Sequence, residues 1–335
     1  MRRNGLLAEN GLSGAGNREE KMNSKGNGKG MQQSMETITP IEVSSFNDLV
    51  SETNNPRPLK QKWVFRGQTG NWPLTTSLER LCSSLHISQR DHGLEIEEIL
   101  QREFQRRFYH YATHVPEPND NLEWLATMQH YGAATRLLDW SYSPYVALYF
   151  ALERTAEKDD HSVVWAVDLR WLQRKAMQLV AKHPQYGKKT RKVKTAIQHF
   201  MLESPAAEEK KIASNWLYQL NHPCKFVFPA TPFNLNTRLT VQKGLFICPA
   251  DPTETFVSNL EGMPGIYSGY GHAVRAGSQK NILKFHICRD KRRGFLRSLQ
   301  SMNVSADSLF PGLDGFARSL AVYHHRFDEL PEITA

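Results

Sequence analysis

Cysteine is scarce in this sequence, with four residues among 335. No Cys-x-x-Cys pair occurs, so neither a disulfide framework nor a zinc ribbon is indicated by the spacing of Cys82, Cys224, Cys248 and Cys288. His110 and His114 are four residues apart, as two metal ligands on one helix face would be, but no nearby carboxylate is placed as a third ligand. We therefore expect buried free thiols and no metal site.

Long apolar runs are also missing. No stretch of about eighteen apolar residues could cross a membrane, and the first residues lack the apolar core of a signal peptide. We expect a cytoplasmic protein with no membrane partner. Residues 1–38 contain scarcely any aromatic or branched apolar side chains, so they cannot offset the entropy lost on ordering. They are predicted to form a disordered tail.

The rest of the composition is that of a globular protein, with 40% hydrophobic and 10% aromatic residues. The net charge of +8 admits a nucleic-acid partner. The basic run 188–194 is more simply explained as a solvated surface, and no RNA-recognition or zinc-finger pattern accompanies it. A nucleic-acid partner therefore rests on charge alone.

Hydrophobic periodicity predicts short strands and amphipathic helices. Strands are expected at residues 63–65, 163–169, 225–228, 245–248 and 282–287. Helices are expected at residues 95–111, 122–128 and 144–151, with a polar helical insertion or layer at 170–220. Residues 289–323 are expected to form two helices joined by a turn at 310–315. We predict one α+β domain over residues 41–335, with a mixed or antiparallel sheet and flanking helices.

The segment 128–151 is the hardest to explain by folding alone. It places His130, Arg136 and Asp139 within ten positions, ahead of a helix that Ser143 caps and Pro144 begins. The N-terminus of a helix favours an anion, because its first amides and its dipole are positive. We expect the polar cluster to lie there and to bind a phosphate or a carboxylate.

Each of these side chains also has a purely structural interpretation. Arg66, at the end of a predicted strand, can hold a diphosphate bidentately or close a buried ion pair. His130 suits a general base, a donor to a ribose hydroxyl, or a packed core group. Asp139 has apolar neighbours, which makes solvation unexpected and favours an arginine partner or a helix cap over catalysis.

A family resemblance links these segments to others further along the chain. The sequence resembles the FRG domain, a bacterial family named after a Phe-Arg-Gly motif, over residues 42–320. The segments that carry the likeness are Phe65-Arg66-Gly67, Gln129-His130-Tyr131-Gly132, residues 135–140, residues 144–151, the Arg238, Gln242, Gly244 and Phe246 pattern, and residues 309–315.

The same segments are similar to the NAD-binding half of ADP-ribosyltransferases of the Arg-Ser-Glu class. That resemblance implies an ADP-ribosyltransferase-like cleft in which Arg66 holds NAD phosphate and Thr135 and Ser141 lie near nicotinamide. Gln242 falls where the family has a glutamate, and an amide cannot act as an anion, so Glu254 is the nearest acid to consider. The site residues expected for the cofactor are Arg66, Gly67, Gln68, Thr135, Arg136 and Ser141, and those for catalysis are His130, Asp139 and Gln242.

Three functions agree with these residues. The first is a nucleotide-binding cleft, with NAD as the possible cofactor, that transfers ADP-ribose to a macromolecular acceptor in a toxin or phage-defence role. The second is a non-catalytic module that senses a nucleotide or a phosphorylated partner. The third is an RNA-directed nuclease or phosphotransferase that uses His130 and the basic surface.

Overall fold

The computed structural model describes residues 34–35, 38–53, 61–112, 115–154, 160–202, 205–219, 224–265 and 280–320. All of them belong to one unit that runs from residue 32 to residue 335. The described strands are β1 (Ile41–Glu42), β2 (Trp63–Gln68), β3 (Leu138–Ser141), β4 (His161–Asp168), β5 (Val227–Ala230), β6 (Gly244–Pro249) and β7 (Ile282–Cys288). Each contains at least one β-branched or aromatic residue, which suits a pleated surface.

These strands form one sheet in the order β1-β7-β4-β2-β3-β6-β5. β1 pairs with β7 in parallel, and every other neighbouring pair in the described sheet is antiparallel. This confirms the predicted α+β class with a mixed sheet. Since β4 and β2 lie near the middle of the order, the Phe65-Arg66-Gly67 motif on β2 is placed near the centre of the sheet.

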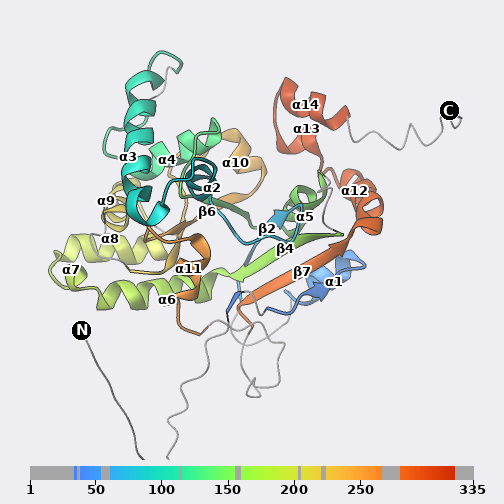
Figure 1. Ribbon diagram of the computed structural model, residues 1–335, viewed down its shortest axis with the longest axis horizontal. Helices are drawn as coiled ribbons and strands as arrows, with labels where there is room; N and C mark the ends of the chain where they lie inside the picture. Colours follow the sequence, from blue (N-terminus) through green and yellow to red (C-terminus); the bar gives the residue numbers. More distant parts are fainter. Residues whose placement is uncertain are drawn as a thin grey trace, which may run out of the picture. The chain divides into compact units, whose positions relative to one another are not determined.

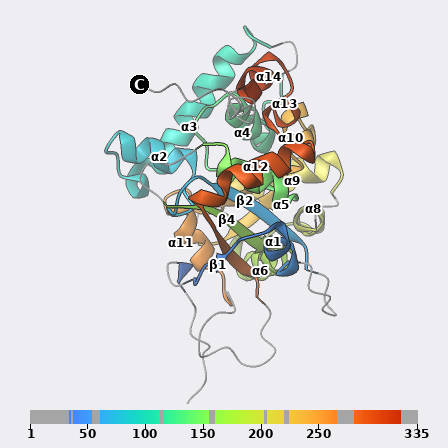
Figure 2. The ribbon, with the colours of Figure 1, turned by 90° about the vertical axis from the view of Figure 1, so that its right-hand side faces the viewer.

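Helices cover both faces of the sheet. Their bounds are α1 (Phe46–Ser51), α2 (Ser77–Ser84), α3 (Gln89–Phe108), α4 (Asn121–His130), α5 (Pro144–Leu152), α6 (Leu169–Lys182), α7 (Pro184–Gly187), α8 (Arg191–Met201), α9 (Ala207–Tyr218), α10 (Thr237–Val241), α11 (Phe256–Glu261), α12 (Arg292–Ser301), α13 (Ala306–Leu309) and α14 (Leu313–Leu320), with a 3-10 turn η2 (Arg289–Lys291). In Figure 1, α6 to α9 lie to the left of the sheet and α12 to α14 to the right, and Figure 2 views the molecule from the α12 side.

Side chains of the central strands alternate between two hydrophobic cores, as the two-residue period of a strand requires. Val64 and Trp165 belong to the core that also includes residues of α4, α6, α8, α9 and α11. Phe65 and Val164 belong to the core shared with α1, α5, α12 and α13. The sheet therefore separates two packed layers, and the helices at 169–218 form part of the first.

Helix α5 lies closely against β2. A Cβ added at Gly67 would be 1.9 Å from the Ala147 carbonyl oxygen, so glycine is needed for this approach. The start of α5 is as the sequence predicts: Pro144 is the first helical residue, and the Ser143 hydroxyl accepts a hydrogen bond from the Val146 amide at 3.4 Å. The helix can thus bring its face against the strand that carries Arg66.

The end of the predicted N-terminal tail packs on the core. Residues 1–33, 36 and 37 lie outside the described residues, but Met35 and Ile38 are buried in the first core. The Met35 amide also donates a hydrogen bond to Glu261 Oε1 at 2.7 Å. The tail predicted for residues 1–38 therefore extends too far, because its last apolar side chains find a place in the core.

All four cysteines are free thiols; Cys82 and Cys248 are buried, and Cys224 and Cys288 are half-buried. His114 lies outside the described residues, so the expected position of His110 and His114 on one helix face stays a prediction. None of the helices in the described part of the chain combines the length and apolar composition that a membrane crossing requires.

Candidate functional site

Segments that are far apart in the sequence line one cleft of about 550 Å³. The lining comes from β2, β3, α5, α10, the start of β6, and the α13–α14 region, and so includes most segments on which the family resemblance rests. Its principal polar residues are Arg66, Gln68, Thr69, Arg80, Asp139, Ser141, Glu153, Arg154, Arg238, Gln242 and Arg318. This cleft is the candidate functional site.

Arg66 enters the cleft from the middle of β2. Its Nη1 donates a hydrogen bond to the Asp139 carbonyl oxygen on β3 at 2.7 Å, and its Nε is buried with no hydrogen-bond partner among the described residues. Burial lowers the pKa of Arg66, and the Asp139 charge opposes that shift. The guanidinium is thus fixed on one side, and its remaining donors are available to a ligand.

Four further arginines surround Arg66 in the cleft: Arg80, Arg154, Arg238 and Arg318. Two of them lie over the same aromatic ring, with Cζ of Arg238 at 4.6 Å and Cζ of Arg318 at 4.9 Å from the centroid of Phe310. Among the described residues the lining contains two carboxylates, so five positive groups face two negative ones there. Within the described residues, none of the five arginines forms an ion pair.

Glu153 is a cleft residue that the sequence did not predict. It follows the last turn of α5 and is half-buried. Burial raises the pKa of its carboxyl, and the charges of Arg154, Arg318 and Arg238 offset this in part. A charged turn after a helix does not indicate that the turn faces a cleft, so no sequence pattern marks this residue.

Asp139 is exposed, which corrects the expectation that its apolar neighbours would exclude solvent. Leu138 and Trp140 point into the first core, and the strand period turns Asp139 to the other face, toward the cleft. Gln129 Nε2 donates a hydrogen bond to Asp139 Oδ2 at 2.8 Å. The side chain neither caps a helix nor closes an ion pair in the described structure.

Gln68, Ser141 and Gln242 line the cleft while they make structural hydrogen bonds. Gln68 Oε1 accepts from Trp165 Nε1 at 2.7 Å. The Ser141 hydroxyl donates to the Gln242 carbonyl oxygen at 2.7 Å, and Gln242 Nε2 donates to the Leu309 carbonyl oxygen at 3.0 Å. The Gln242 amide therefore joins α13 to the rim of the cleft.

Arg136 and Thr135, both expected at the cofactor, are buried away from the cleft lining. Arg136 is 1% exposed and pairs with Glu97, with Nε 2.6 Å from Glu97 Oε2. Its Cζ also lies 4.3 Å from the ring centroid of Tyr218. Burial acts to lower the pKa of Arg136, but the interactions with Glu97, Tyr218 and Cys248 together outweigh it and the pKa is raised. The Thr135 hydroxyl donates to Gln129 and so holds the loop before β3.

His130 is the last residue of α4 and is not among the residues that line the cleft. It is half-buried, and burial lowers the pKa of its imidazole, with the charge of Arg238 acting in the same direction. The cluster expected at the start of α5 is thus divided: Asp139 reaches the cleft, Arg136 is in the core, and His130 ends a helix.

Glu254, the acid considered from the sequence in place of the missing glutamate, is also away from the cleft lining. Its carboxylate contacts Lys225 Nζ at 2.9 Å and Arg90 Nη2 at 3.6 Å, and it accepts from the Ser258 hydroxyl at 3.0 Å. Asp139 and Glu153 are the carboxylates that the structure brings to the cleft instead.

Comparison with protein families gives one match in this region. Residues 61–160 match the family model of the FRG domain. The chain contains an FRG domain. Comparison with curated proteins found no match, and comparison with solved structures found none either. The matched part of the FRG domain includes Arg66, Asp139 and Glu153, whereas Arg238 and Arg318 come from sequence that follows the match.

Proposed function

We propose that the FRG domain binds a nucleotide by its phosphates in the arginine-lined cleft. The observation that carries this proposal is the charge of the lining, in which five arginines face two carboxylates and form no ion pair among the described residues. Bringing like charges together costs free energy unless an anion compensates them. An anionic ligand with several charges would do so.

Guanidinium chemistry favours phosphate as that anion. The planar fork of arginine donates two parallel hydrogen bonds to phosphate oxygens, and such charge-assisted bonds are stronger than neutral ones. The volume of about 550 Å³ falls within the roughly 300–1,000 Å³ of small-molecule sites. Trp72, which is 44% exposed, and the rings of Phe150 and Phe310 lie in the same lining, where a base can stack.

The resemblance to ADP-ribosyltransferases extends this proposal to NAD and to ADP-ribose transfer. In that reaction the bond between nicotinamide and ribose breaks, nicotinamide leaves with the electron pair, and ribose C1′ bonds to a nucleophilic acceptor atom, whose proton passes to a base. Glu153 replaces Gln242 as the acid we assign to the ribose, because Gln242 cannot ionise and Glu153 lines the cleft. Transfer of ADP-ribose to a macromolecular acceptor would be the activity of a cytoplasmic toxin or phage-defence effector.

A non-catalytic nucleotide sensor is the second candidate. It is favoured by Gln242, whose amide is bonded to the Leu309 carbonyl oxygen where the transferase class has its glutamate. A nuclease or phosphotransferase that relies on His130 has less support, because His130 does not line the cleft.

Calorimetric titration of the purified chain tests the binding proposal. We expect NAD, ADP-ribose and ADP to bind and adenosine, which has no phosphate, to bind at least about tenfold more weakly, a difference of about 1.4 kcal/mol. A short single-stranded RNA is titrated in parallel. Absence of binding by all phosphate-containing nucleotides contradicts the proposal, and binding of RNA alone would assign the cleft to nucleic acid.

Incubation with NAD labelled on the adenine separates the two candidates. Transfer of label to protein or nucleic acid in a lysate, abolished in Glu153→Gln, supports the transferase. Binding of NAD without label transfer or release of nicotinamide supports the sensor.

A further inference from the structure

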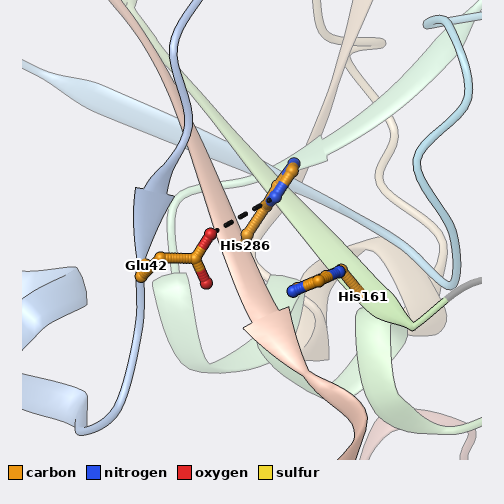
Figure 3. Close-up of side chains that lie close together, drawn as sticks. All are labelled: Glu42, His161 and His286. Carbon is orange, nitrogen blue, oxygen red and sulfur yellow. Dashed lines mark ion pairs between the residues drawn. The ribbon is translucent and has the colours of Figure 1, made fainter.

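A second group of polar side chains lies on the sheet at β1, β4 and β7, and is made of different residues from the cleft. Glu42, His161 and His286 each contribute a potential ligand atom, and these atoms lie within 4.8 Å of one another (Figure 3). His286 Nδ1 is 3.6 Å from Glu42 Oε1, and the centroids of the two imidazole rings are 5.2 Å apart. Figure 3 shows a nitrogen of the His161 ring turned toward Glu42.

The register of the sheet brings these residues together. Glu42 is opposite His286 in the parallel β1–β7 pair, and His161 is opposite Cys288 in the antiparallel β4–β7 pair. His286 and Cys288 are two residues apart on β7, so they share a face. Cys288 Sγ lies 3.3 Å from His161 Nε2, within hydrogen-bond distance, at the edge of this group.

Hydrogen bonding leaves His286 of this group unsatisfied. The His286 side chain is 11% exposed, yet its Nε2 has no hydrogen-bond partner among the described residues. Its Nδ1 is 3.6 Å from the Glu42 carboxylate, beyond the roughly 2.7–3.2 Å of a good N–H···O bond. Two ligands on one tetrahedral zinc, with bonds of about 2.0–2.3 Å, are separated by roughly 3.3–3.8 Å. The 3.6 Å between His286 Nδ1 and Glu42 Oε1 falls in this range, and all three ligand atoms lie within 4.8 Å of one another.

We propose that Glu42, His161 and His286 form a zinc-binding site. Two imidazole nitrogens and one carboxylate oxygen are a donor set that zinc accepts, whereas magnesium and calcium require mainly oxygen ligands. No sequence motif marks the site, because its ligands come from three strands that are distant along the chain.

Such an ion would fasten the short strand β1 to the sheet. β1 has two residues and one neighbouring strand, and the adjacent Val43 amide donates to the His286 carbonyl oxygen at 2.9 Å. A zinc ion bound by Glu42, His161 and His286 would link β1 to β4 and β7 through its coordinate bonds. The site therefore has a structural role, and its occupancy changes the stability of the fold.

The test uses the full chain after treatment with a chelator. Titration with zinc is expected to show one site per chain, while magnesium gives none. His286→Ala and Glu42→Gln are expected to weaken zinc binding by at least about tenfold. Loss of a residue that only hydrogen-bonds to a metal ligand already costs about 10–100-fold in affinity, and these two residues are ligands themselves. His199→Ala is the matched control, because His199 Nδ1 pairs with Glu209 Oε2 at 2.9 Å but has no second histidine in that pair. Its zinc binding should equal that of the parent.

Melting of the metal-free proteins shows whether each variant folds. The Glu42 side chain is 60% exposed, so Glu42→Gln keeps the test valid if His286→Ala does not fold. Zinc should raise the melting temperature of the parent and of His199→Ala, and leave that of Glu42→Gln nearly unchanged. The proposal is overturned if the parent binds no zinc stoichiometrically, or if Glu42→Gln and His286→Ala bind it as the parent does.

Discussion

Arg66 follows a short apolar segment and Arg136 precedes one, and the structure gives the two arginines different surroundings. Arg136 has a buried carboxylate partner in Glu97 and an aromatic ring beside it. Arg66 has a backbone carbonyl at one nitrogen and no acidic side chain paired with it in the described structure. The first arrangement is that of a group that holds the fold, and the second is that of a group that can receive a ligand.

Arg66→Lys should therefore reduce ligand affinity while the fold persists. Lysine keeps the charge but loses the planar fork that grips phosphate bidentately. We expect NAD or ADP-ribose to bind about tenfold or more weakly, with a melting temperature close to that of the parent. Arg107→Lys serves as the control, since Arg107 is exposed and pairs with Glu103 on the same helix. A large fall in melting temperature for Arg66→Lys alone would show that Arg66 is structural.

Glu97→Gln should destabilise the protein strongly. The change leaves the buried Arg136 guanidinium without its counter-charge, and loss of one partner of a buried ion pair costs about 3–5 kcal/mol. Glu103→Gln, in an exposed pair, should change the free energy of unfolding by less than about 1 kcal/mol. Urea denaturation of both variants measures the difference, and equal effects would contradict the structural role of the Arg136–Glu97 pair.

Glu153 makes stability depend on pH. Burial raises the pKa of its carboxyl in the folded protein, so the unfolded chain ionises first as the pH rises. As the pH rises from the ordinary pKa of a carboxyl group to the raised pKa of Glu153, the contribution of Glu153 to the free energy of unfolding therefore decreases. Glu153→Gln should be more stable than the parent at pH 7 and no more stable at about pH 4, as denaturation midpoints will show. A difference independent of pH would contradict this explanation.

At the scale of elements, the contact between β2 and α5 sets the position of the cleft. Gly67→Ala places a methyl group 1.9 Å from the Ala147 carbonyl oxygen and 2.5 Å from the Ala151 amide nitrogen, so the helix must move. We expect a loss of about 1–3 kcal/mol or more. Gly187→Ala is the control, because no atom lies within 4 Å of its added Cβ. Chemical denaturation that gives the same stability for both variants would show that α5 is free to shift.

Helices and strands could be predicted from the sequence better than the residues of the site. Ser143 and Pro144 predicted the start of α5 because a cap acts on the amides next to it. The partner of Arg136 could not be predicted, since Glu97 lies on the distant helix α3 and the pair depends on how that helix packs. The same reason hid Glu153 and Arg318, whose role follows from the convergence of distant segments on one cleft. Local signals specify elements, and tertiary packing assembles the site.

At the scale of the whole molecule, the boundary of the folded unit can be tested by truncation. Removal of residues 1–33 should leave the melting temperature nearly unchanged, because their composition offers little apolar surface. Removal of residues 1–38 also deletes Met35 and Ile38, which are 5% and 3% exposed, and each buried side chain contributes about 1.5–3 kcal/mol. The melting temperature should then fall by several degrees, at about 2 °C per kcal/mol in a large domain. Equal melting of both truncated proteins would place the boundary elsewhere.

The place of β7 in the sheet has a consequence for synthesis. It is the last described strand in chain order, yet it lies between β1 and β4, where Val164 is opposite Phe285. During synthesis β4 leaves the ribosome long before β7, so one edge of this apolar strand stays unpaired until β7 is made. Unpaired strand edges attract other chains. A nascent chain released before residue 282 would keep that edge open, and translation through β7 is what protects it from aggregation.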